Sequence, residues 1–192
     1  MKSKLKPLRI LKVWSTFQTE IKYHDHYLAD VMKKNGHETV FFASDCIEPA
    51  WKPFLKNKSF AFKESWNGHI IYRFASKSIA NKPFLKKPFK FIRAIKNYKP
   101  DIIHILGLAY PVNQLALIAS LILRKTPVFV NDHGIISEER KGILARIFYL
   151  NSFLIYSIYK KIKNLNKPIQ ETKFIEQMKN QEKLKKNINL ND

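Results

Sequence analysis

Apolar and polar positions at the start of the chain predict a strand, a helix and a second strand. The run at residues 10–14 is rich in strand-forming side chains and stops at the turn-prone pair Ser15-Thr16. Residues 22–35 then carry apolar side chains at helical spacing, and Gly36 follows as a left-handed helix stop. Residues 38–43 form the next strand and complete a βαβ unit. The apolar positions of the helix are Tyr23, Tyr27, Leu28, Val31 and Met32.

The middle of the chain has a weaker pattern. Residues 45–66 are less regular, with scattered aromatic side chains, and no strand or helix is assigned to them. A third strand is predicted at residues 69–74, directly after the turn-forming pair Asn67-Gly68. The Lys/Pro/Phe-rich stretch at residues 82–90 predicts a mobile loop that leads into a helix at residues 89–97.

Strands and helices alternate again in the second half. The near-continuous apolar run at residues 101–106 is typical of a strand buried in a parallel sheet. A buried helix follows at residues 112–123, with Pro111 in its first turn, and a fifth strand at residues 127–131 comes next. Residues 138–163 predict a helix with a break near residues 151–152.

This alternation predicts the fold class. The chain is expected to be an α/β protein with a single Rossmann-like domain, built on an open, doubly wound, mostly parallel sheet. Ligands of such sheets bind at the carboxyl ends of the strands. The length of 192 residues fits one ordinary domain, and a hydrophobic content of 45% is enough for a real core.

Cysteine content and hydropathy exclude several classes of protein. The single cysteine, Cys46, excludes an internal disulfide framework and a cysteine-cluster zinc site. No apolar run reaches the roughly 18 residues of a membrane-spanning helix. The apolar stripe at residues 143–159 is expected to cover the core, with a membrane-interface helix as the alternative. A cytoplasmic protein is therefore expected, with peripheral attachment to the inner face of the cell membrane as the alternative.

The net charge of +20 is concentrated in one region. Residues 51–99 contain thirteen Lys and Arg residues but only one acid, Glu64. Such a field attracts phosphate groups on anionic lipid, nucleic acid or a phosphorylated carrier, although general Lys enrichment explains it equally well. No helix-turn-helix, zinc-finger or RNP pattern is present, so nucleic acid is the least favoured partner.

The first candidate binding and catalytic residues lie in and just after the loop that follows the first strand. A helix start offers free N–H groups to a phosphate, but no glycine lies between Ser15 and Asn35. The loop is therefore neither a dinucleotide fingerprint nor a P-loop, which disfavours NAD and ATP. Glu20, His24 and Asp25, together with groups at the later strand ends, are a candidate acid/base or metal cluster.

The histidines divide into two groups. His104 is expected to be a buried, hydrogen-bonded residue that shapes the cleft, whereas His24 and His26, in a first helical turn, are expected to be solvated. His37 is most simply a turn residue. His133 directly follows an apolar strand and precedes Gly134, at a position where this fold presents groups to a ligand, so a functional role is expected.

Several segments resemble, in order, the N-terminal domain of family 4 glycosyltransferases, enzymes with the two-domain GT-B fold. The resemblance covers residues 8–178. Residues 1–178 are therefore expected to form the acceptor-side domain, and residues 179–192 a polar tail or the start of an interdomain linker. The matching segments are LRILKV at residues 8–13, YLADVMKKNGHETV at 27–40, KPDIIHILG at 99–107, PVFVNDHG at 127–134 and, in degraded form, residues 164–175.

The resemblance implies transfer of a sugar from a nucleotide donor to a glycan or lipid-linked acceptor, with retention at the anomeric carbon and with no metal or cofactor. His133 matches the histidine that reaches toward the donor sugar and is the implied catalytic residue. A neutral imidazole can hydrogen-bond sugar hydroxyls, and backbone amides can stabilise the diphosphate. The implied loop near the donor phosphates is Glu20, Ile21, Lys22 and Tyr23, and the implied acceptor or cleft residues are Asp132, Gly134, His104, Gly107 and Glu138.

The chain also departs from the family pattern. Ile21-Lys22 stands where many members have a Gly-Gly pair, and Leu106 stands where some have a second histidine. The donor-binding C-terminal domain is not recognised in the sequence, so no transfer is expected from this polypeptide alone, and a separate subunit carrying that domain is an expected partner. The alternative function is a non-catalytic basic module that binds anionic lipid or another phosphate-bearing ligand.

Overall fold

A computed structural model describes residues 6–47, 51–55, 58–79, 81–123, 126–131, 154–155 and 157–161. The chain divides into two compact units, residues 1–159 and 160–192. Lys160 and Lys161 are the described residues of the second unit, and the fold and the site below belong to the first. Asp132, His133, Gly134 and Glu138, together with the break predicted near residues 151–152, lie outside the described residues.

A six-stranded sheet forms the centre of the first unit, with the strand order β3-β4-β2-β1-β7-β8. Every neighbouring pair is parallel except β3 and β4, which form an antiparallel hairpin at one edge. A second sheet pairs β5 with β6. The strands are β1 (Arg9–Val13), β2 (Glu38–Ser44), β3 (Lys63–Trp66), β4 (His69–Phe74), β5 (Ser76–Ile79), β6 (Lys82–Leu85), β7 (Ile102–Leu106) and β8 (Val128–Asn131).

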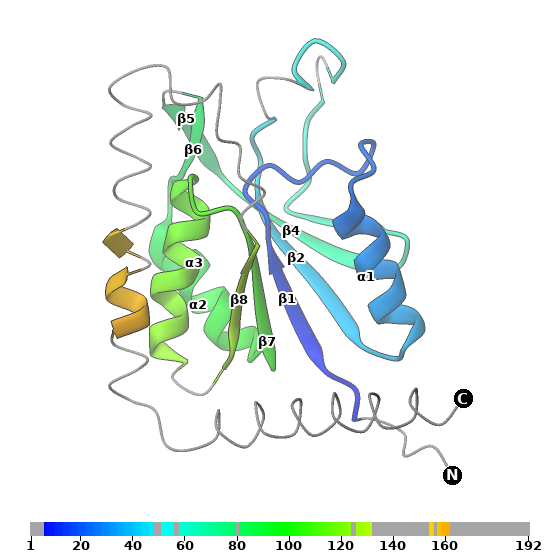
Figure 1. The fold of residues 1–192 in the computed structure, drawn as a ribbon. Helices are drawn as coiled ribbons and strands as arrows, with labels where there is room; N and C mark the ends of the chain where they lie inside the picture. The colour runs from blue at the N-terminus through cyan, green and yellow to red at the C-terminus, as the bar shows by residue number, and fades with distance from the viewer. Residues whose placement is uncertain are drawn as a thin grey trace, which may run out of the picture. The chain divides into compact units, whose positions relative to one another are not determined.

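Helices lie on both faces of the large sheet, as Figure 1 shows: α1 on one face, α2 and α3 on the other. Alternate residues of each strand serve opposite faces. Leu11 and Val13 of β1 join the core cluster that packs against α2 and α3, whereas Phe41 of β2 packs with Phe17 and Ala29 on the side of α1. The helices are α1 (His24–Lys34), α2 (Pro88–Tyr98) and α3 (Pro111–Ile122).

The predicted α/β class is confirmed, with a six-stranded and mostly parallel sheet. The order of the parallel strands, β4-β2-β1-β7-β8, is compatible with the predicted Rossmann-like arrangement. In this order the chain winds outward from β1 in one direction and then restarts from β7 in the other. The carboxyl ends of β1 and β7 therefore form the switch point at which such sheets bind ligands.

Two local predictions were wrong. Residues 63–66 form β3, although their sequence, KESW, has no apolar alternation; the Asn67-Gly68 turn folds them back onto β4. Both turn residues have positive φ, as a tight hairpin requires. The predicted loop at residues 82–90 contains β6, which pairs with β5 around Asn81, a third residue with positive φ.

Helix α1 exists, but the apolar stripe that predicted it does not face the core. Its buried residues are Asp25, His26 and Ala29. Tyr27 and Val31, two members of the stripe, are more than half exposed. The polar residues of α1 face inward because charged and hydrogen-bonding groups lie beneath the helix and bond to them.

Residues 154–155 and 157–161 are helical, and they test the interpretation of the apolar stripe at residues 143–159. Ile155 and Tyr159 pack against the core cluster of α2 and α3. Leu154 and Ile158 remain about half exposed. For these residues the core-covering interpretation is supported.

Candidate functional site

The candidate site lies at the carboxyl ends of β1 and β7. Lys12 of β1 and His104 of β7 are paired in register, one residue before the end of β1 and two residues before the end of β7. Gly107 follows β7 with a φ of +72° and donates its N–H to the carbonyl of Asn131, at the end of β8. The first loop, residues 14–23, leaves β1 at the same edge. The sheet thus brings together the first loop, His104 and Gly107, three of the features predicted from the sequence.

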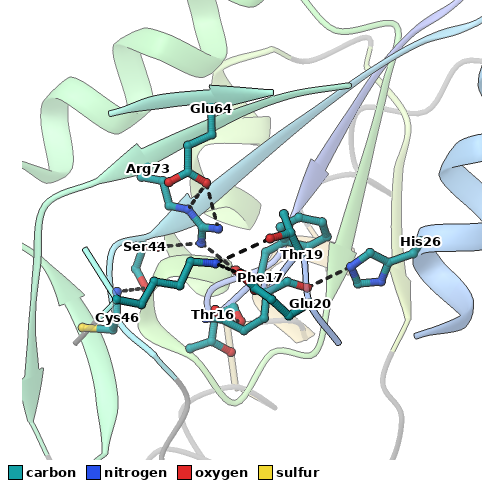
Figure 2. A network of polar contacts seen from close by, with 11 residues as sticks. Thr16, Phe17, Thr19, Glu20, His26, Ser44, Cys46, Glu64 and Arg73 are labelled. Atoms are coloured by element: carbon teal, nitrogen blue, oxygen red, sulfur yellow. Dashed lines mark hydrogen bonds and ion pairs between the residues drawn. The ribbon is translucent and has the colours of Figure 1, made fainter. Parts of the chain in front are cut away.

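A buried arginine holds the first loop in place. The Arg73 guanidinium donates from Nη1 to the carbonyl of Phe17 at 2.6 Å and to that of Ser44 at 3.4 Å. Its Nε and Nη2 both bond to one carboxylate oxygen of Glu64 at 3.3 Å. Figure 2 shows this cation between β3, the end of β2 and the first loop. Burial lowers the pKa of Arg73 and the Glu64 charge opposes that change, so the guanidinium stays charged.

Further contacts fix the two ends of the loop. Ser44 donates its hydroxyl and its N–H to the carbonyl of Ser15. Lys58 bonds to the Glu20 carboxylate and lies 3.5 Å from the Thr19 hydroxyl. Burial would raise the pKa of Glu20, but the hydrogen bond and charge of Lys58 together lower it. Glu20 is therefore ionised and paired at neutral pH.

His26 closes the loop onto α1. The Tyr23 N–H donates to Nδ1 at 3.1 Å, so Nε2 carries the proton and donates to the Gln18 carbonyl at 2.9 Å. The ring also stacks on Phe17 at 4.7 Å. Burial lowers the pKa of His26, so the imidazole is neutral at pH 7. The prediction that His26 is solvated was wrong, because the loop folds over the first helical turn.

Beneath α1 lies a buried ionic cluster. The Lys12 ammonium donates to the Asp25 carboxylate at 2.8 Å and to the Asp25 carbonyl at 3.2 Å. His104 Nδ1 lies 3.9 Å from the same carboxylate oxygen, and His24, 60% exposed, reaches the other oxygen at 3.0 Å. Burial lowers the pKa of Lys12. Burial would raise the pKa of Asp25, but the Lys12 hydrogen bond and charge together lower it.

The predicted residues of the first loop have separate surroundings. Glu20 is paired with Lys58 and lies apart from the Asp25 cluster, so the predicted group of Glu20, His24 and Asp25 is only partly assembled. Lys22 is exposed, Ile21 is half-buried, and the ring of Tyr23 packs edge-on against Trp14 at 5.0 Å. His104 is buried, as predicted.

Sequence reasoning missed Lys12 and Arg73. Lys12 interrupts an apolar strand, and a charge at the centre of a buried strand needs a partner. That interruption was the available signal, but the strand pattern could not name Asp25 as the partner. Arg73 likewise interrupts an apolar strand, HIIYRF, and nothing else in the sequence indicated its three partners.

Within the part of the chain that the structure describes, no group of three or more His, Cys, Asp or Glu side chains is placed to hold a metal ion. In the same residues no helix is long and apolar enough to cross a membrane. No protein-family model matches the sequence, and no curated protein is significantly similar to it.

Proposed function

We propose that this chain supplies the acceptor-side domain of a retaining glycosyltransferase, which acts together with a donor-binding domain on a nucleotide sugar and a glycan or lipid-linked acceptor. The observation that carries the proposal is the switch point between β1 and β7, where the first loop, His104 and Gly107 meet. Two of the segments that resemble the family, residues 8–13 and 99–107, contain β1 and β7, the strands whose carboxyl ends form this edge. The Asp25 cluster and the Arg73 contacts give it a fixed shape.

The residues of this edge suit a sugar substrate. Lys22 is exposed one residue before the N-cap of α1, so its ammonium and the positive end of the helix both favour an anion there. His104 places a buried imidazole next to Lys12 and Asp25 in the part of β7 that leads to this edge. In this proposal Glu20, Ile21, Lys22 and Tyr23 lie near the donor phosphates, and His104 and Gly107 shape the acceptor side.

His133 is the proposed catalytic residue, with a neutral imidazole hydrogen-bonded to the donor sugar. It comes two residues after Asn131, whose carbonyl accepts the Gly107 N–H at the carboxyl edge of the sheet. Asp132, Gly134 and Glu138 belong to the same proposed cleft. No cofactor or metal is required in this proposal, since the leaving diphosphate is stabilised by backbone amides and cationic side chains.

A reconstitution assay tests the proposal. Lysate of host cells that lack the gene receives the purified chain and one radiolabelled nucleotide sugar at a time. We expect label to enter the glycan or lipid fraction, with the anomeric configuration retained, only when the chain is added. His133→Ala should lower this incorporation by at least about 100-fold.

The matched control is His37→Ala. His37 accepts the Leu8 N–H next to the start of β2, at the amino edge of the sheet, so this variant should retain activity. The proposal is wrong if no nucleotide sugar gives chain-dependent incorporation, or if His133→Ala is as active as the wild type.

A further inference from the structure

Helix α2 has one side in the core and one side in water. Phe91 and Ile95 are fully buried against the sheet and α3. At 3.6 residues per turn the opposite side carries Phe89, Arg93 and Lys96, and all three are exposed. Phe89 is 84% exposed, the largest exposure of any large hydrophobic side chain among the described residues.

Within the described part of the chain, the cations around this side have no acidic counterpart. Residues 86–99 contain six Lys and Arg residues and no Asp or Glu. Among the described residues none of these six side chains forms an ion pair; Glu64, the one acid between residues 51 and 99, is bonded to Arg73. This surface therefore keeps its full positive charge and favours an anionic partner.

The arrangement is also unfavourable for the helix itself. Helix N-termini favour acidic side chains, yet Lys87 is the N-cap of α2, Lys86 precedes it, and Lys90 lies in the first turn. Neither folding nor packing calls for three lysines beside an exposed phenylalanine at this position. Local features that work against stability often mark a functional surface.

A second exposed aromatic ring extends the same surface. Phe62, 52% exposed, lies beneath the Lys90 ammonium, with 4.9 Å between the nitrogen and the ring centroid. The cations and aromatic rings are therefore interleaved. We define the α2 surface by its members: Phe62, Lys86, Lys87, Phe89, Lys90, Arg93 and Lys96.

We propose that the α2 surface docks on an anionic lipid bilayer. Phe89 inserts at the boundary between headgroups and acyl chains, and Lys86, Lys87 and Lys90 contact lipid phosphates. Basic helices with exposed aromatic residues bind membrane interfaces in this manner, by apolar burial and attraction to anionic lipid together. Nucleic acid is less suited, because single strands stack on several aligned rings along a groove and the α2 surface is a convex helix side.

This inference is independent of the proposed function, because it concerns α2 and not the β1/β7 edge. It is tested with vesicles that contain neither nucleotide sugar nor acceptor. A failure of membrane docking therefore leaves the glycosyltransferase proposal untouched, and the reverse also holds.

The experiment is co-sedimentation of the full chain with vesicles of phosphatidylcholine alone, or with phosphatidylglycerol added, at physiological salt. We expect binding to the anionic vesicles only. Lys87→Gln with Lys90→Gln should weaken the partition by about fivefold for each lysine, and Phe89→Ser should weaken it by about tenfold. The matched controls are Lys6→Gln with Lys34→Gln and Phe54→Ser, at exposed positions outside the α2 surface, and they should bind as the wild type does.

A second readout reports insertion directly. Phe89→Trp should give tryptophan fluorescence that is quenched by brominated lipids beyond the level of the Phe54→Trp control. The proposal is overturned if neutral and anionic vesicles bind equally, if Phe89→Ser binds as the wild type does, or if the control lysines matter as much as Lys87 and Lys90. Tight binding to a single-stranded oligonucleotide without vesicle binding would also overturn it and indicate a nucleic-acid surface.

Discussion

Lys12 has no exposed side-chain surface, yet its ammonium group is charged and bonded to Asp25. A buried ion pair adds little to stability relative to an apolar pair, because desolvation offsets the attraction. Removing one partner is different, since the other charge then remains buried without compensation. The Lys12 and Asp25 pair therefore fixes which side of α1 faces the sheet.

Lys12→Met should lower the free energy of unfolding by about 3–5 kcal/mol. The methionine fills the space, but the Asp25 carboxylate loses its main hydrogen bond. Urea unfolding at pH 7 measures the loss. Lys12→Met combined with Asp25→Asn should recover most of it, because no buried charge remains. Equal stability of Lys12→Met and the wild type would show that the pair does not hold α1.

At the residue scale the sequence predicted some environments well and others poorly. His104 is buried as predicted because it stands in a continuous apolar strand. His26 was predicted to be solvated, since a first helical turn is usually exposed, but the first loop folds over it. That contact depends on the path of the first loop, which Arg73 holds by its bond to the Phe17 carbonyl from far along the sequence, so no local pattern could reveal it.

At the scale of elements, the predictions that succeeded rest on local chemistry. Helix α1 ends as predicted, because Gly36 adopts a φ of +84°. The N–H groups of Gly36 and His37 donate to the carbonyls of Lys33 and Met32, which is the Schellman pattern. The strand β3 was missed because it is a polar edge strand defined only by its pairing with β4. The apolar face of α1 was assigned to the core because periodicity cannot detect the charges beneath the helix.

Gly36→Ala should destabilise the protein by about 1–2 kcal/mol. No atom lies within 4 Å of the position of the added Cβ, so the cost comes from the backbone conformation alone. Gly36→Asn should cost less, because asparagine tolerates the left-handed region. Thermal unfolding of the two variants measures the difference. Equal losses would mean that side-chain contacts, and not φ, control this helix end.

At the scale of the molecule, one guanidinium links parts of the chain that are far apart in sequence. Arg73 joins β4 to Glu64 of β3, to Ser44 at the end of β2 and to Phe17 in the first loop. These contacts tie the antiparallel edge of the sheet to the loop beside the switch point. Arg73 of β4 therefore stabilises the candidate site although none of its three partners belongs to β4.

Arg73→Lys tests this link. Lysine keeps the charge but cannot contact Glu64 and two carbonyls in one planar arrangement, so we expect stability to fall by about 2–3 kcal/mol. Hydrogen exchange in residues 14–19 should rise more than exchange in β7, because the loop loses its anchor while the sheet persists. Arg9→Lys is the matched control: the side chains of its pair with Asp101 are 44% and 37% exposed, so the pair should contribute at most about 1 kcal/mol. If Arg73→Lys and Arg9→Lys lose equal stability, or if exchange rises equally in β7, Arg73 is not the anchor of the first loop.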